Sequence, residues 1–258
     1  MVWSKPAKNF ISALIPPAFW LGVWQLAAWV VELKLHSKGN ELLLPYPATV
    51  LSALVRLVGE GEFFLTVFTS LGRILLGLAL GTAFGSLLAV LTCASRWADR
   101  LLSPAIRVVR ATPVASFILL VLLWTGKDFV PTVISALMVV PVVWANLSRG
   151  IRETDRQLLE LAKAYRFPLF KTVRLVYLPS LRPYFVSAIT TATGLAWKSG
   201  VAAEVLCVPK ASIGTQILNT KLYLEIPDLF AWTAVVVMLS LLLEKLLRFL
   251  LEGRKGGV

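Results

Sequence analysis

The residues best placed to do chemistry are polar and ionisable side chains within a long apolar segment, residues 184–206. Polar groups are costly in lipid, so a membrane helix turns such a face toward a water-filled cavity or another subunit. Lys198 could attract an anion there, pair with a neighbouring carboxylate, or extend to the membrane interface. Their helical spacing makes these residues a candidate solute pathway: Thr190, Thr191, Gly194, Trp197, Lys198 and Glu204.

Catalysis within the membrane has little support in the sequence. One histidine, His36, cannot form a metal site alone, and the chain has no H-E-x-x-H or G-x-S-x-G motif. Residues 194–200 read GLAWKSG, which has the glycines and lysine in the wrong order for a phosphate-binding loop. We therefore expect no catalytic residue, metal site or cofactor, and a membrane enzyme is only a remote alternative.

A second informative group lies in residues 148–183, the longest polar connection between apolar segments. Apolar residues recur at helical spacing from Asp155 to Tyr165, and Asp155 or Thr154 could cap that helix. A second helical stretch runs from about Leu169 to Tyr177. The pattern predicts two short amphipathic helices that either dock into a groove of another protein or lie on the anionic inner leaflet.

In this connection Glu160, Leu161 and Ala162 are followed, at fixed spacing, by Val176 and by Leu178-Pro179. These residues resemble, in that order, the E-A-A, the Ile and the closing Leu-Pro of the EAA loop of ATP-binding-cassette importer permeases. That motif reads E-A-A, three residues, Gly, nine residues, I-x-L-P. Arg166 stands where the family has Gly, so Arg166 with Phe167-Pro168 is expected to build the turn in another way. The resemblance implies an ATPase-coupling loop, with Glu160 making a polar contact at the joint. The residues assigned to this coupling loop are Glu160, Leu161, Ala162, Tyr165, Arg166, Val176, Leu178 and Pro179.

Further motifs resemble the nitrate, sulfonate and taurine branch of these permeases, over about residues 43–247. They are, in chain order, Leu44-Pro45 with Pro47, Ser70-Leu71 with Arg73, Thr112-Pro113, Leu123-Trp124-Thr125-Gly126, Asn146 with Gly150, and Trp197, Val201, Ala203 and Glu204 for W-x-x-x-V-x-A-E. The resemblance implies a type I importer permease (MetI-like) fold. It also implies a second permease subunit, with a homodimer favoured, two ATPase subunits that bind the ATP, and an external solute-binding protein.

Composition independently indicates a membrane protein. Of the 258 residues, 57% are hydrophobic and only 16% are charged, and the mean hydropathy is +0.77. A soluble domain carries about 25% charged residues. We therefore expect one all-α, polytopic membrane helical bundle over residues 1–258. The net charge of +12 does not indicate nucleic-acid binding, because the basic residues lie between apolar runs rather than on one solvated face.

Six segments approach the length of about 20 apolar residues that a spanning helix needs. They are residues 10–31, 66–93, 111–125, 129–147, 184–206 and 227–247. Most Lys and Arg residues fall on one side of this topology, so the positive-inside rule places both termini and the 148–183 loop in the cytoplasm. A multi-pass protein of the inner (plasma) membrane is expected.

Gly77, Gly81 and Gly85 form a small-xxx-small ladder in the second segment, which predicts close helix packing. The function predicted from all these features is a permease subunit for a small solute. An anion such as nitrate, a sulfonate or taurine is one class of solute, and a vitamin precursor is another. An autonomous channel or secondary transporter, needing no ATPase, is the alternative.

Overall fold

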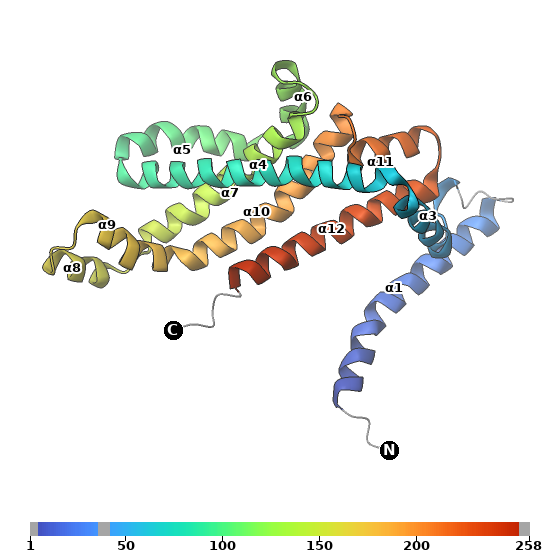
Figure 1. The fold of residues 1–258 in the computed structure, drawn as a ribbon, viewed down its shortest axis with the longest axis horizontal. Coiled ribbons are helices and arrows are strands. Elements are labelled where there is room, and N and C mark those ends of the chain that lie inside the picture. The colour runs from blue at the N-terminus through green and yellow to red at the C-terminus, as the bar shows by residue number, and fades with distance from the viewer. Residues whose placement is uncertain (1–4, 36–41, 253–258) are drawn as a thin grey trace. The chain divides into compact units, whose positions relative to one another are not determined.

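A computed structural model of the protein describes residues 5–35 and 42–252. Within those ranges the chain is helical, joined by short turns, and contains no strand (Figure 1). This confirms the predicted all-α fold class. Five of the six predicted spanning segments coincide with single long helices, to within one residue at Phe129: α1 (Lys5–Leu35), α4 (Gly61–Ala94), α7 (Val130–Arg152), α10 (Leu178–Cys207) and α12 (Ile226–Glu252).

Three of the described helices are both long and apolar enough to cross a membrane, namely α4, α7 and α12. The number rises to four if the bent pair formed by α5 (Arg96–Ala111) and α6 (Val114–Trp124) counts as one span. The predicted total of six spans is not confirmed.

The third predicted span, residues 111–125, is not one straight helix. α5 and α6 meet at an angle of 108°. The break lies at Thr112, whose backbone is extended with ψ of 134° because the following Pro113 disfavours a helical conformation there. α6 has 11 residues, a length of about 16 Å, which is too short to cross the bilayer alone.

The glycine ladder brings the backbones of α4 and α7 together. A Cβ atom added at Gly77 would lie 2.5 Å from the carbonyl oxygen of Thr132, and one at Gly81 would lie 2.7 Å from that of Ala136. A Cβ atom added at Gly85 would lie 2.9 Å from the carbonyl oxygen of Val140. Only hydrogen fits at these three positions, so the predicted packing role is confirmed.

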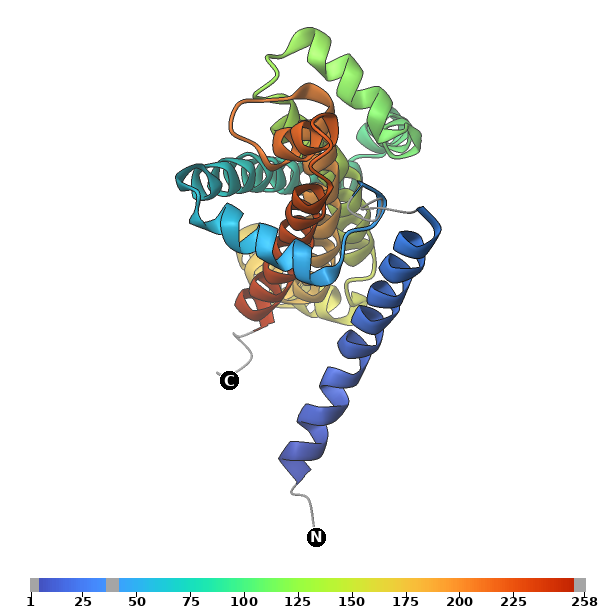
Figure 2. The same cartoon turned by 90° about the vertical axis from the view of Figure 1, so that its right-hand side faces the viewer.

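α7 and α10 run side by side through the centre of the bundle (Figures 1 and 2). Ser135 of α7 donates a hydrogen bond of 3.1 Å to the carbonyl oxygen of Ala196 on α10. A cluster of buried apolar side chains continues this contact toward α6, and consists of Ile118, Val121, Val130, Ile134, Ala203 and Cys207.

The fold divides into two compact units. Unit 1 comprises the chain up to Leu65 together with Gln216–Val236, and unit 2 comprises Thr66–Thr215 with the chain from Val237. In unit 1, Arg56 of α3 (Pro47–Gly59) donates a 2.6 Å hydrogen bond to Asp228. The single permease domain predicted over residues 1–258 stays a prediction.

Substituting one ladder glycine tests the close packing of α4. Gly77→Ala places a methyl group against backbone atoms that cannot move independently, so we expect the free energy of unfolding to fall by about 1–3 kcal/mol. The measurement is thermal unfolding of the purified chain in detergent.

Gly72→Ala on the same helix is the matched control, because no atom lies within 4 Å of its Cβ position. Alanine is the better helix former, so this variant should be neutral or up to about 1 kcal/mol more stable. Equal stability of the two variants would contradict the packing role.

Candidate functional site

Residues 148–183, predicted to be a coupling loop, contain two short helices joined by a tight turn. α8 spans Arg156–Ala164 and α9 spans Leu169–Thr172. The carboxylate of Asp155 accepts a 2.8 Å hydrogen bond from the Gln157 amide, which caps α8 at its start. The two helices predicted from the sequence are confirmed as helices.

The turn after α8 uses a side chain where a glycine is usual. The Phe167 amide donates to the carbonyl oxygen of Ala162, and the Arg166 amide donates to that of Lys163, each at 2.9 Å. These are the two bonds of a Schellman motif, which needs one residue in the left-handed region. Arg166 supplies it with φ of 51°. The prediction that Arg166 builds the turn in another way is therefore wrong.

The second half of the loop continues into α10 without a break. α9 is followed by one π-helical turn, η1 (Val173–Tyr177), and then directly by α10. Pro179 lies in the first turn of α10, where a proline is tolerated. Val176 is buried. A displacement of α9 can therefore reach the centre of the bundle through continuous helical backbone.

The two ends of the loop are tied together at its base. Glu153 accepts hydrogen bonds from the Tyr184 hydroxyl at 2.5 Å and from the Arg149 guanidinium at 2.8 Å. These bonds, first that from Tyr184 and then that from Arg149, hold the pKa of the Glu153 carboxyl below its ordinary value. Gly150 allows this approach, since a Cβ there would lie 2.7 Å from the Tyr184 ring.

Much of the apolar surface of the loop faces outward. Ala162 is buried, whereas Glu160 is exposed and Leu178 is 58% exposed. The exposed apolar set on α8, α9 and the turn between them consists of Leu158, Leu161, Tyr165, Leu169 and Phe170. An apolar patch of this kind at one end of a bundle is typical of a protein or membrane contact.

The predicted pathway residues on α10 lie in different environments. Trp197 and Glu204 are buried inside the protein, at 1% and 0% exposure. Thr190 and Gly194 are half-buried, and the exposed members are Thr191 and Lys198. Lys198 forms no ion pair with a carboxylate of the described chain. The pathway role of these six residues stays a prediction.

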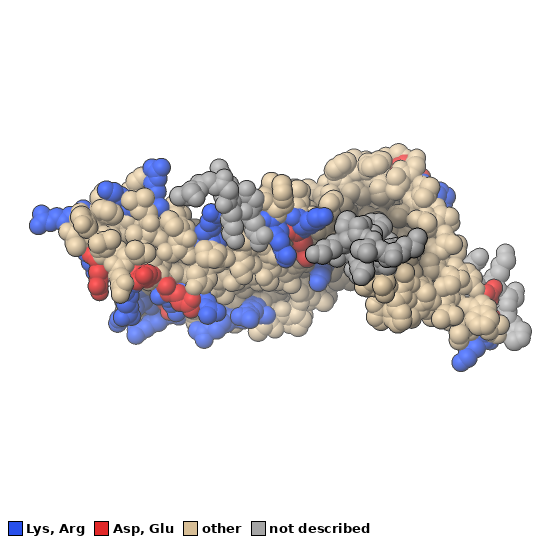
Figure 3. Space-filling model, turned by 90° about the horizontal axis from the view of Figure 1, so that it is seen from below, with Lys and Arg blue, Asp and Glu red and all other residues tan. Residues whose placement is uncertain are grey.

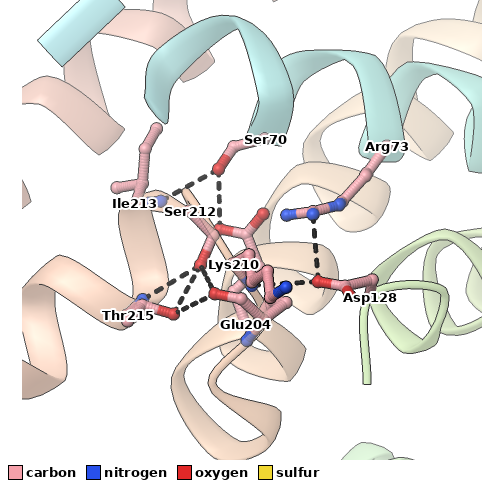
Figure 4. Close-up of polar contacts among 9 residues, drawn as sticks. Ser70, Arg73, Asp128, Glu204, Lys210, Ser212, Ile213 and Thr215 are labelled. Atoms are coloured by element: carbon pink, nitrogen blue, oxygen red, sulfur yellow. Dashed lines mark hydrogen bonds and ion pairs between the residues drawn. The ribbon is translucent and has the colours of Figure 1, made fainter. Parts of the chain in front are cut away.

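The Glu204 carboxylate is the centre of a buried hydrogen-bond network (Figure 4). Its Oε2 atom accepts from the Ser70 hydroxyl of α4 at 2.9 Å and from the Gly214 amide at 3.1 Å. Ser70 in turn accepts from the Ile213 amide at 2.9 Å. A Cβ at Gly214 would lie 2.4 Å from the Glu204 Cβ, so only glycine permits this contact. The network thus binds α4 and α10 to the start of α11 (Ile213–Leu222).

An ion pair lies beside this network (Figure 4). Arg73, one turn after Ser70, contacts Asp128 at 3.2 Å, and the same carboxylate oxygen accepts from the Lys210 amide at 2.9 Å. The turn after α10 is strained, since Val208 and Ala211 both have positive φ. Side-chain acceptors from α4, α10 and the α6–α7 connection therefore hold this turn in place.

Ser70, Arg73 and Glu204 all belong to the sequence motifs given above, but the motifs do not predict that these residues meet. The feature of the sequence that could have indicated this site is the presence of these polar side chains within or beside two apolar segments. Asp128 carried no such signal, because it lies in a short connection between α6 and α7.

Basic side chains are concentrated at one end of unit 2. Figure 3 shows Lys and Arg gathered over the part that carries α5, α8 and α9. α5 alone contributes Arg96, Arg100, Arg107 and Arg110, beside the exposed Trp97. This end is formed by segments that the sequence assigned to the cytoplasm.

Comparison with known proteins relates this chain to membrane transport. The family described as "Binding-protein-dependent transport system inner membrane component" matches residues 81–252. A protein of Escherichia coli (strain K12) named as an aliphatic sulfonates transport permease, SsuC, is 30% identical over 94% of this chain and 90% of its own length. The Bacillus subtilis (strain 168) protein of that name is 26% identical over 96% of this chain and 89% of its own length.

Two further comparisons also relate this chain to transport proteins. The taurine transport system permease protein TauC of Escherichia coli (strain K12) is 25% identical over 96% of this chain and 90% of its own length. A crystal structure of an amino acid ABC transporter with histidines superposes with a TM-score of 0.56 at 16% identity, covering 80% of this chain and 92% of that one. The last likeness concerns the fold alone.

The strained Arg166 gives a test of the loop turn. Arg166→Gly removes the left-handed strain, so we expect α8 and its turn to become more stable by about 1 kcal/mol. The Phe167 amide should then exchange its hydrogen several-fold more slowly, as measured by hydrogen exchange and mass spectrometry on the full chain.

Lys163→Gly is the control, because it places the same residue in the last turn of α8, where the backbone is still helical and glycine costs up to about 1 kcal/mol. The Lys163→Gly variant should accelerate exchange of the Phe167 amide hydrogen. The Schellman assignment fails if both glycine variants accelerate exchange equally.

Proposed function

Because the chain belongs to the family of binding-protein-dependent transport system inner membrane components, in the sulfonate and taurine branch of ATP-binding-cassette importer permeases, we propose that it carries a small anionic solute and couples to ATPase subunits through residues 155–179. It is a multi-pass inner-membrane transport subunit and not an enzyme. Permeases of this kind act with ATPase subunits and a solute-binding protein.

The anionic solute is supported by the relatives and by the charge of the chain. Two relatives are named for aliphatic sulfonates and one for taurine, compounds that all carry a sulfonate group. The net charge is +12, and the exposed Lys198 lies on the predicted pathway face of α10. A fixed cation in a low-dielectric pathway attracts an anion strongly.

The observation that carries the coupling proposal is the unbroken helical backbone from Leu169 to Cys207. An ATPase that closes around α8 and α9 would move the start of α10 with them, because no flexible joint intervenes. The exposed Leu161 and Tyr165 supply the apolar contact, and Glu160 beside them supplies a polar one.

The assembly proposed is a pair of permease subunits, two ATPases and an external binding protein. We favour a homodimer, with both termini and the 148–183 loop in the cytoplasm, where the ATPases reside. An autonomous channel or secondary transporter would not need the exposed apolar set on α8 and α9. ATP is bound by the partner subunits, so this chain needs no cofactor.

Co-purification of the chain with its ATPase tests the coupling proposal. Leu161→Asp places a charge on the exposed apolar set, so the ATPase should be lost or reduced at least about ten-fold. Glu160→Ala should weaken the association less, since it removes one polar contact. The measurement is the amount of ATPase recovered with tagged permease from detergent extracts of co-expressing cells.

Leu222→Asp is the matched control, because Leu222 is 67% exposed and lies on α11, outside the loop. It should retain the ATPase. Should Leu161→Asp retain as much ATPase as Leu222→Asp, the loop is a membrane-surface helix, and an autonomous transporter becomes the leading account.

A further inference from the structure

A hollow of about 470 Å³ lies between the first turns of α10 and the last turns of α12, within unit 2. Two arginines line it, Arg182 from α10 and Arg248 from α12. Three hydroxyl side chains of α10 complete the polar lining: Ser187, Thr190 and Thr191. No acidic residue contributes to the lining.

Both arginines are exposed, and no carboxylate contributes to the lining beside them. Among the described residues, neither Arg182 nor Arg248 forms an ion pair, whereas Arg56, Arg73 and Arg149 each do. Like charges around one hollow repel each other, and this repulsion is relieved when an anion enters. Arginine is also the side chain best suited to hold an oxyanion, through paired N–H donors.

Two of the three hydroxyl groups are free to donate hydrogen bonds into the hollow. Thr190 gives its proton to the carbonyl oxygen of Val186 at 2.9 Å, so it cannot donate into the hollow. Ser187 and Thr191 lie one turn apart on the same face of α10 and make no hydrogen bond within the described chain. Their protons remain available for oxyanion oxygens.

We propose that this hollow binds an oxyanion, a sulfonate or phosphate group, between Arg182 and Arg248. Both residues lie toward the end of the bundle that carries the 148–183 loop, since Arg182 follows Pro179 by three residues. Glu244, one turn before Arg248, lies against Gly194 and not in the lining, and it forms no ion pair with either arginine.

Two sources can supply such a group: the transported solute on its way to the cytoplasm, or the headgroup of an anionic lipid. The first source rests on the proposed function, because it makes the hollow a release site for the anion. The binding itself does not depend on an ATPase, so it can be measured on the chain alone.

The test is a titration of the full-length chain in neutral detergent with sodium sulfate and sodium methanesulfonate, followed calorimetrically, with sodium chloride at matched ionic strength as the reference. Saturable binding is expected for the wild type. Arg182→Gln and Arg248→Gln should each weaken it at least about ten-fold, because each removes charge-assisted hydrogen bonds. Lys245→Gln, an equal loss of charge at an exposed position of α12 outside the hollow, should change it less than about two-fold.

A second arm uses native mass spectrometry of the same variants with short-chain phosphatidylglycerol and phosphatidylcholine. Arginine-dependent binding of the free anions supports a solute site, and arginine-dependent binding of phosphatidylglycerol alone supports a lipid headgroup in the same hollow. The proposal is overturned if neither anion source binds saturably, or if Lys245→Gln weakens binding as much as the arginine variants. Such a failure would leave ATPase co-purification, and therefore the import function, unaffected.

Discussion

The hydrogen bonds that Ser70 and Gly214 donate to the buried Glu204 carboxylate are the interaction on which the rest of unit 2 depends. A carboxylate removed from water is costly unless protein donors replace its hydration. Here donors from α4 and from the start of α11 reach one carboxylate oxygen, Oε2, so a single side chain connects three helices. The other oxygen, Oε1, is buried and has no hydrogen-bond partner within the described chain. The glycine ladder then packs α4 onto α7, and the bundle gains a rigid centre.

α10 joins that centre to the surface where other proteins would act. Its far end carries Glu204, and its near end continues through η1 into α9 without a break. A π-helical turn is rare and often marks a functional position, because it stores a register change within a helix. The anion hollow lies at the same near end. A movement of the loop would therefore change the spacing of Arg182 and Arg248 while Glu204 stays anchored.

The sequence was most informative where hydropathy and length decide the structure, as in α4, α7 and α12. It was less informative where the backbone conformation of a single residue determines the structure. The 108° bend before Pro113 and the left-handed φ of Arg166 are set by local geometry that periodicity does not report. The pairing of Ser70 with Glu204, 134 residues apart, depends on tertiary contact. Helical spacing could place Glu204 on a polar face, but could not show that the chain itself covers that face.

The most direct test of the account is solute accumulation in liposomes that contain this chain with its ATPase, supplied with the binding protein and a radiolabelled sulfonate. The account predicts accumulation against a gradient that needs ATP, and that stops when either the ATPase or this chain is omitted. Equal accumulation without ATP or without the ATPase would contradict it, because the chain would then transport on its own.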